Sequence, residues 1–310
     1  MAIRVLFPAT ARAHVPGGLW RAITTQFHRE AEASMKNTFV NQIVLISGGA
    51  GGIGSATARL LIERGAHVVL ADLDRRALEQ VAAQLGASAS TVIIDVTDPA
   101  SCAAGVAAVL HEHGRLDAIW ANAGISAFGP MELLDSNSWR RVIEVNLLGA
   151  YNLVHAALPA IIENCGYVAF TASWASFAHS PGHSAYAAAK AGLEAMANSL
   201  RSEVADQGVR VGVFHPGWIA TPMVLEKVEH QAAFNTLLES LPSPLRKITE
   251  PEALAKTLAK AFQERPAKVV YPAAGWLLHI LRPLLATQIF TSSPRRAAPQ
   301  IRRQFTLQKK

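Results

Sequence analysis

Ser47-Gly-Gly-Ala-Gly-Gly-Ile-Gly54 is the stretch that decides the fold of this 310-residue chain. It lies between a short β-branched run, Ile43–Ser47, and a run with helical spacing, Ala56–Arg64. A glycine turn at such a junction lets backbone N–H groups and the positive end of the helix approach a pyrophosphate. The stretch therefore predicts a nucleotide-binding loop that opens an α/β fold.

Each residue of the loop has an expected task. Gly48 makes the turn, Gly52 allows close approach of the ligand, and Gly54 lets the helix pack on the strand, with Ile53 between the last two. Tight packing of a helix on a strand is the alternative reason for these glycines. Asp72 favours the binding site, because a carboxylate eighteen residues after Gly54 is placed to accept hydrogen bonds from the ribose of a dinucleotide.

Asp72 also bears on the choice of cofactor. A carboxylate accepts a hydrogen bond from a ribose 2′-hydroxyl and repels a 2′-phosphate, so NAD is favoured over NADP. Arg75 and Arg76 follow closely and would partly neutralise the carboxylate, although arginines at the start of a helix are often simply solvated. The sequence thus predicts NAD and leaves NADP as the alternative.

Strand-like and helix-like runs alternate outward from this loop. Short apolar strands without polar alternation are typical of a parallel sheet that is covered on both faces. The sequence therefore predicts an α/β protein with a single-domain Rossmann fold, a doubly wound parallel sheet with helices on both faces. The expected strands are Ile43–Ser47, His67–Ala71, Ser90–Ile94, Ala118–Trp120, Tyr167–Ala172, Val209–His215 and Val269–Tyr271. The expected helices are Ala56–Arg64, Arg75–Leu85, Ser101–His113, Ser138–Leu158 (ended by Pro159), Ala185–Val204 and Pro251–Gln263.

The predicted domain covers residues 35–272, with a substrate-side insertion at about 220–249. Residues 1–34 are expected to be a dispensable extension or an artefact of start-codon choice, because Met35 opens a normal lead into the first strand. A transit peptide and a membrane-surface helix are the alternatives. Residues 273–310 form a C-terminal extension, apolar and then basic.

The charge is distributed unevenly. The net charge of +6 and the pI near 9.5 divide into +2 for residues 1–35, −5 for 36–264 and +9 for 265–310. A mildly acidic body argues against nucleic-acid binding by the whole protein. Only 17% of the residues are charged and 50% are hydrophobic, which excludes a largely disordered chain.

The cysteines and the apolar runs exclude further classes. Cys102 and Cys165 cannot form a disulfide framework and show no metal-ligand spacing, so both are expected to be buried in a reducing compartment and no metal is expected. No apolar run is long enough to predict a membrane-spanning helix, since Trp276–Phe290 is interrupted by His279, Arg282 and Pro283.

Tyr186 and Lys190 are four residues apart in an alanine-rich run, so their side chains share one face of the expected helix. A free tyrosine has a pKa of about 10 and is a poor base at neutral pH, but a nearby ammonium stabilises the phenolate and lowers that pKa. Such a pair can pass a proton to or from a substrate oxygen. The spacing alone could arise by chance, so the assignment of a catalytic role to this pair depends on the neighbouring motifs.

In its motifs, the stretch from Ile43 to Met223 resembles the classical short-chain dehydrogenases/reductases, the SDR family. The motifs, in order, are the Gly-x-x-x-Gly-x-Gly loop, Asp95, Asn122-Ala-Gly124, Asn146, Ser173 thirteen residues before Tyr186, the Tyr-x-x-x-Lys pair, Pro216-Gly217 and Thr221. Departures are mild: Ser47 replaces the usual Thr, and Ala121 and Ala172 replace a frequent Asn and Ser. None of them removes a catalytic group.

The resemblance implies a role for each of these residues. Tyr186 would be the general acid/base, Ser173 would hydrogen-bond the substrate oxygen, and Lys190 would bind the nicotinamide ribose and depress the pKa of Tyr186. Asn146 would hold a water that continues the proton relay. The cofactor-binding residues would be Gly48, Gly52, Ile53, Gly54, Asp72, Asp95, Val96, Asn122, Ala123, Gly124, Tyr186, Lys190, Pro216, Gly217, Ile219 and Thr221.

The residues expected around the substrate are mostly apolar. The predicted substrate contacts are Ser173, Trp174, Trp218 and Met223, with Ile125, Phe128, Phe177 and Leu225 expected nearby. An aromatic, weakly charged lining suits a hydrophobic alcohol or ketone better than a phosphorylated sugar. His179 and His183 are interpreted as solvated loop residues.

The sequence therefore predicts an NAD(P)-dependent oxidoreductase that interconverts a secondary alcohol and a ketone on a steroid-, retinoid- or lipid-like substrate. An NADPH-dependent 3-oxoacyl thioester reductase, which Asp72 disfavours, and a non-catalytic nucleotide-binding sensor are the alternatives.

We expect a cytoplasmic homodimer or homotetramer that binds no nucleic acid, although the basic tail is the one feature that would support such binding. Residues 273–310 are expected to fold over the substrate pocket or pair with another subunit. Peripheral contact with anionic lipid is the alternative for this segment.

Overall fold

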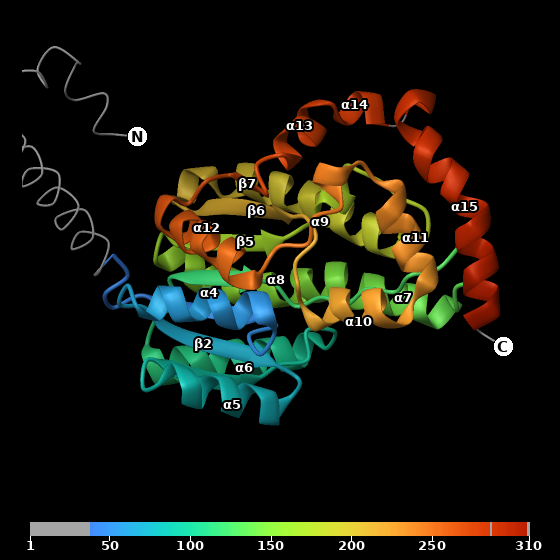
Figure 1. Ribbon diagram of the computed structural model, residues 1–310. Coiled ribbons are helices and arrows are strands. Elements are labelled where there is room, and N and C mark those ends of the chain that lie inside the picture. Colours follow the sequence, from blue (N-terminus) through green and yellow to red (C-terminus); the bar gives the residue numbers. More distant parts are fainter. Residues whose placement is uncertain (1–37, 286, 309–310) are drawn as a thin grey trace, which may run out of the picture.

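The computed structural model describes residues 38–285 and 287–308. The expectations for residues 1–34 and for the last two lysines lie outside the described residues. The centre of the protein is a seven-stranded sheet in which every pair of neighbouring strands is parallel (Figure 1). Its strands are β1 (Ile43–Ser47), β2 (His67–Asp72), β3 (Ala89–Ile93), β4 (Ala118–Ala121), β5 (Tyr167–Thr171), β6 (Arg210–Pro216) and β7 (Lys268–Tyr271).

The strand order is β3-β2-β1-β4-β5-β6-β7. The chain starts in the middle of the sheet, winds outward to β3, and returns to β4 on the other side of β1. All carboxyl ends lie at one edge, and the reversal between β1 and β4 makes a crevice there, which is the usual ligand site of such sheets. The predicted doubly wound α/β fold is confirmed.

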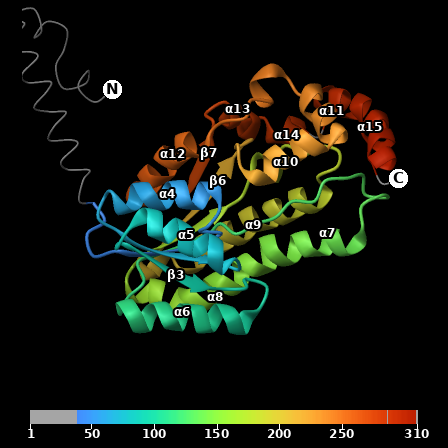
Figure 2. The same ribbon diagram turned by 60° about the horizontal axis from the view of Figure 1, so that its bottom comes forward.

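Helices cover both faces of the sheet (Figure 2). One layer consists of α6 (Pro99–His113), α8 (Gly149–Glu163) and α9 (Ser184–Glu203), and the other of α4 (Gly52–Ile62), α5 (Arg75–Leu85) and α12 (Pro251–Glu264). Alternate residues of β1 belong to different cores: Ile43 and Leu45 pack with the first layer, Val44 and Ile46 with the second. Burial on both faces explains why the strands lack polar alternation.

The predicted end of a helix at Pro159 is wrong. The helical stretch consists of α7 (Ser136–Ile143), the π-helical turn η1 (Glu144–Leu148) and α8, which runs through the proline to Glu163. Proline removes one backbone donor, but Ala157, Ala160 and Ile161 are buried around it. Their burial holds the helix across the missing hydrogen bond.

Ser136–Glu163 is also the one helical stretch among the described residues that is long and apolar enough to cross a membrane by length and composition. Half of its most apolar window is buried inside the protein, where α8 packs on the sheet and on α6. We therefore interpret it as a core helix.

Only one of the two cysteines lies where it was expected. Cys102 is fully buried on α6, and burial raises its pKa to about 11. Cys165 is exposed, so its predicted burial is wrong. It occupies the turn between α8 and β5 with a φ of 45°, where the chain must reverse at the surface before it enters the sheet.

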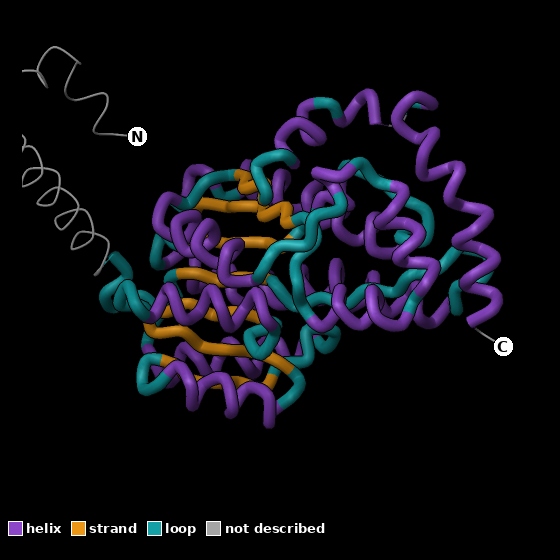
Figure 3. Tube along the Cα trace, viewed as in Figure 1, coloured by secondary structure: helices purple, strands orange, loops and turns teal. Residues whose placement is uncertain are grey.

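An all-helical part stands beyond the carboxyl ends of the strands, clear of the orange strands in Figure 3. Its elements are η2 (Trp174–Ser176), α10 (Pro222–His230), α11 (Ala232–Ser240), η4 (Ser243–Leu245), α13 (Gly275–Ile280), α14 (Arg282–Leu285) and α15 (Gln288–Gln308). The short turn η3 (Ala205–Gln207) lies at the opposite edge, before β6. The predicted insertion at 220–249 thus contains two helices, and α15 packs on α11 through Ala297 and Ile301, which join Phe234 and Leu237 in one apolar cluster.

Candidate active site

The glycine loop between β1 and α4 forms one wall of a cavity of about 420 Å³. Gly48 has a φ of 64°, and a Cβ there would lie 3.0 Å from the Cα of Ala123, so the turn requires glycine. At Gly52 a Cβ would meet only Thr221 and Pro251 side chains at 3.6 Å, an ordinary contact. The protein itself therefore leaves room at Gly52, and the absence of a side chain keeps this wall of the cavity open.

All sixteen residues predicted to bind the cofactor line this cavity, which we call the cofactor cleft. The sequence interpretation missed several others, among them Leu73, Arg141 and Val145. Leu73 and Val145 could have been found as the residues next to Asp72 and Asn146. Arg141 enters from α7, and nothing in the local pattern indicates that this helix reaches the cleft.

Two carboxylates lie at the end of the cleft formed by β2 and β3. Asp72 accepts a hydrogen bond from the backbone N–H of Leu73 at 2.8 Å, and Arg75 and Arg76 are exposed outside the lining. Asp95 accepts hydrogen bonds from the hydroxyl and the backbone N–H of Thr97, at 2.7 and 2.8 Å, and these lower its pKa. These hydrogen bonds hold both side chains in place, and those to Asp95 favour its ionised form.

Asn122 joins three neighbouring strands at the centre of the cleft. Its Nδ2 donates to the carbonyl of Ser47 at 3.1 Å, and its Oδ1 accepts from the hydroxyl of Thr171 at 3.0 Å. The Ser47 hydroxyl in turn accepts the backbone N–H groups of Asn122 and Ala123. The hydroxyl that Ser47 retains is therefore used to connect β1 to the loop after β4.

Tyr186 and Lys190 project from α9 where the cleft ends. The Nζ of Lys190 donates to the carbonyl of Thr171 at 2.6 Å and lies 5.6 Å from the centroid of the Tyr186 ring. Burial lowers the pKa of Lys190 to about 7. Burial also raises the pKa of Tyr186, and a hydrogen bond with the Ser173 side chain opposes that rise.

Asn146 lies on the π-helical turn η1 and is fully buried. Its side chain pairs with the backbone of Ile125, accepting from N at 2.8 Å and donating to O at 2.9 Å. It lines neither cavity. These two bonds hold the loop after β4 against η1, and a water held by Asn146 stays a prediction.

A second cavity of about 350 Å³, the substrate cavity, lies beside the cleft. Tyr186, Gly217, Met223 and Val224 line both cavities. The four predicted substrate contacts, Ser173, Trp174, Trp218 and Met223, all line this second one. A group bound in the substrate cavity can therefore meet the cofactor cleft at the tyrosine.

Four other predicted neighbours of the substrate lie elsewhere. Phe128 and Phe177 are buried behind the wall, Ile125 belongs to the cofactor cleft, and Leu225 is 46% exposed. The wall is completed by residues from the all-helical part, which carry no motif. They include Lys227, Phe234, Leu241, Leu245, Leu278 and Leu285.

His183 was interpreted as a solvated loop residue, and this is wrong. It is buried among the rings of Phe128, Trp218 and Phe234, and its ring lies 6.3 Å from that of Tyr186. Burial, and secondarily the charge of Lys227, lowers its pKa to about 3, so the imidazole is neutral. His179 is exposed, as predicted.

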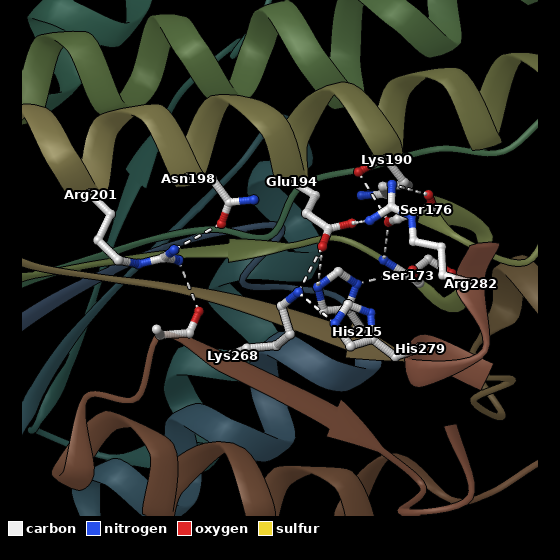
Figure 4. A network of polar contacts seen from close by, with 11 residues as sticks. Ser173, Ser176, Lys190, Glu194, Asn198, Arg201, His215, Lys268, His279 and Arg282 are labelled. Atoms are coloured by element: carbon white, nitrogen blue, oxygen red, sulfur yellow. Dashed lines mark hydrogen bonds and ion pairs between the residues drawn. The ribbon is translucent and has the colours of Figure 1, made fainter. Parts of the chain in front are cut away.

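Figure 4 shows a charged network between α9, the helix that carries Tyr186, and strands β6 and β7. Glu194, one turn after Lys190 on α9, is 3% exposed and accepts from the Nζ of Lys268 on β7 at 2.8 Å and from Arg282 on α14 at 3.3 Å. His215 on β6 lies 3.9 Å from the same carboxylate and contacts the carbonyl of Ser173 at 3.2 Å. The network ties the C-terminal segment to the helix that carries Tyr186.

Within the described residues, no group of three or more His, Cys, Asp or Glu side chains is placed to hold a metal ion.

This chain is similar to known proteins both in sequence and in fold. A family profile described as short chain dehydrogenase matches residues 42–232. Cyclohexanol dehydrogenase of Acinetobacter sp. is 33% identical over 233 residues, 74% of this chain and 90% of that protein. Cis-4-hydroxycyclohexanecarboxylate dehydrogenase of Sinomonas cyclohexanicum is 36% identical over 230 residues, 73% and 90% of the two chains. The crystal structure of 3-ketoacyl-(acyl-carrier-protein) reductase from Brucella melitensis, complexed with NADH, superposes with a TM-score of 0.67 at 25% identity, covering 75% of this chain and 97% of that one.

Proposed function

Because this chain belongs to the short-chain dehydrogenase family and is an NAD(P)-dependent oxidoreductase acting on alcohol groups, we propose that it interconverts a hydrophobic secondary alcohol and its ketone. The observation that carries the proposal is the position of Tyr186, at the junction of the cofactor cleft and the apolar substrate cavity and beside Ser173. A proton donor at that junction can serve the oxygen of a carbinol whose carbon faces the cleft.

In the proposed mechanism Tyr186 takes the proton from the alcohol or returns it to the ketone oxygen, and Ser173 orients that oxygen. A nicotinamide bound in the cleft supplies or accepts the hydride. Burial of Tyr186 favours its neutral form, so the phenolate needs a cation nearby. Lys190, whose Nζ lies 5.6 Å from the centroid of the Tyr186 ring, would serve this purpose in its ammonium form, because an opposite charge favours the phenolate.

We propose NAD as the preferred cofactor. Asp72 lines the cleft, and no arginine from the start of α5 joins it there to receive a 2′-phosphate. Asp95 lies next to it as a second anion. This arrangement supports a ribose with free hydroxyl groups.

Alicyclic alcohols are the first substrates to test within the steroid-, retinoid- or lipid-like class. They are supported by the two relatives that act on cyclohexane rings and by the aromatic wall of Trp174, Trp218 and Phe234. A 3-oxoacyl thioester reductase is the second candidate, favoured by the likeness to the Brucella melitensis enzyme. A cytoplasmic homodimer or homotetramer remains our expectation, with the half-exposed Leu148 and Tyr151 as a contact face.

The test is a turnover screen followed by nicotinamide absorbance, with NAD and NADP as hydride acceptors for the alcohols and NADH and NADPH as hydride donors for the thioester. Cyclohexanol, a hydroxysteroid, a long-chain secondary alcohol and a 3-oxoacyl thioester are the four arms. The proposal expects turnover of at least one of the three alcohols with NAD. Turnover of the thioester alone with NADPH would favour the second candidate, and NAD binding without turnover of any arm would favour the sensor.

A further inference from the structure

One charged side chain interrupts the apolar wall of the substrate cavity. Lys227, in the last turns of α10, lines the cavity and is only 9% exposed. Its Nζ donates to the carbonyl of Met223 at 2.8 Å. Among the residues that the structure describes, no carboxylate lies within ion-pair distance of Lys227, whereas the partly buried Lys268 is paired with Glu194.

An ammonium in this position is incompletely satisfied. It has three N–H donors, and the protein accepts from one of them through a carbonyl of the same helix. Burial penalises the charge and lowers the pKa of Lys227, and the carboxylate of Glu226, which lies outside ion-pair distance, opposes this only in part. Buried charges are normally paired, so an anion supplied from within the cavity would complete the site.

The position along α10 places the ammonium on the substrate side. Met223 and Val224 line both cavities, and Lys227, one helical turn later, lines only the substrate cavity. Lys227 is also close enough to His183 to influence its titration, and that ring lies 6.3 Å from the ring of Tyr186. A ligand that reaches both Tyr186 and Lys227 would therefore carry its carbinol and its anionic group at different positions.

We propose that the substrate is a hydroxy acid, with its oxo acid as the product: a compact apolar body with a carboxylate away from the carbinol carbon, bound by Lys227. This inference rests on the proposed alcohol–ketone interconversion and narrows its substrate class. The alternative is a lysine whose only role is its hydrogen bond to the carbonyl of Met223, in the first turn of its own helix. Such a lysine would give no preference for acids.

The first experiment measures binding without turnover. Cyclohexanecarboxylate, which has no alcohol to oxidise, is titrated into the full chain while the fluorescence of Trp174 and Trp218 is followed, since both line the cavity. We expect saturable quenching that is weakened at least tenfold in Lys227→Met, with Lys256→Met, an exposed lysine on α12, as the matched control. Acetate, which lacks the apolar body, should not compete at the same concentration.

The second experiment compares turnover of 4-hydroxycyclohexanecarboxylate and cyclohexanol. The wild type should prefer the acid in kcat/KM by at least about tenfold, or about 1.4 kcal/mol, and Lys227→Met should lose that preference through KM. Equal quenching in wild type and Lys227→Met, or a preference that survives the substitution, would overturn the inference. Lysine-dependent binding without turnover of either alcohol would instead count against the proposed function alone.

Discussion

The cofactor cleft and the substrate cavity meet at Tyr186, yet they are built in different ways. Most of the cleft is formed by loops that directly follow strands of the parallel sheet and carry short motifs, and α9 adds the Tyr186–Lys190 pair. The cavity is assembled from η2, α10, α11, η4, α13 and α14, which lie far apart in the sequence. The cofactor cleft therefore depends mainly on backbone geometry, and the substrate cavity depends on side-chain packing between distant segments.

The largest effect should come from Tyr186, which lines both cavities and carries the hydroxyl group at their junction. Tyr186→Phe removes the hydroxyl and keeps the ring, so we expect turnover to fall by about 10²–10⁴-fold, the usual contribution of a general acid/base. NAD affinity, measured by titration, should be retained. Tyr151→Phe, which alters an exposed tyrosine on α8, is the control. Turnover near the wild-type value in Tyr186→Phe would contradict the proposed mechanism.

The next effect concerns the substrate side through Glu194. Glu194→Ala leaves Lys268 and Arg282 without their partner, and breaking a buried ion pair costs about 3–5 kcal/mol. We expect a loss of this size in urea unfolding. Because Arg282 anchors the segment that carries Leu278 and Leu285 into the cavity wall, the KM for the alcohol should rise more than the KM for NAD. Glu264→Ala, which breaks the exposed pair with Lys260, should change stability by less than about 1 kcal/mol.

Acid should weaken the substrate side before it affects the cleft. Burial lowers the pKa of His215 to about 4 and that of His183 to about 3, whereas in the unfolded chain each binds a proton near pH 6.5. The stability that comes from keeping them neutral is complete above about pH 6.5 and is lost progressively as the pH falls toward 4. Urea unfolding at several pH values should show this slope. His183→Phe should flatten it, His230→Phe at the surface should not, and identical slopes in all three proteins would contradict the assignment.

A smaller effect is expected on the cofactor side. Asp72→Ser removes the carboxylate that repels a 2′-phosphate, so the ratio of kcat/KM for NAD to that for NADP should fall by about tenfold, or about 1.4 kcal/mol. Overall stability should not change, because Asp72 bonds only the adjacent backbone N–H among the contacts described for it. Glu79→Gln on the exposed side of α5 is the control. A ratio that does not move would place cofactor selection on other residues of the cleft.

The smallest effect concerns neither cavity directly. Arg296 is an exposed residue of α15, and a basic residue near an anionic membrane contributes about 1 kcal/mol to binding. If residues 273–310 contact lipid, Arg296→Gln should reduce co-sedimentation with anionic vesicles by about fivefold and leave turnover unchanged. A point substitution is preferable to truncation, because Ala297 and Ile301 belong to the core shared with α11. Equal co-sedimentation would count against a role for this arginine.

The sequence by itself determined the fold and the cofactor cleft. A glycine loop after a β-branched run, a carboxylate after the next strand and the Tyr186–Lys190 pair are each local patterns. Their meaning follows from strand and helix geometry, and a parallel sheet brings the ends of its strands to one edge whatever the remaining chain does. This is why all sixteen predicted cofactor residues lie around one cavity, and their roles in binding remain to be tested.

Only the tertiary structure decided how the remaining wall of the substrate cavity is built. Phe128 and His183 illustrate the reason: each has an ordinary local context, and their burial against each other and against Phe234 of α11 depends on contacts between distant segments. In the sequence, nothing distinguishes Lys227 from an ordinary surface lysine, and nothing distinguishes Glu194 from an ordinary carboxylate on a helix. Their burial arises because α10 forms part of the wall of the substrate cavity and because β7 and α14 meet α9 at Glu194, and no pattern within a single segment encodes these contacts.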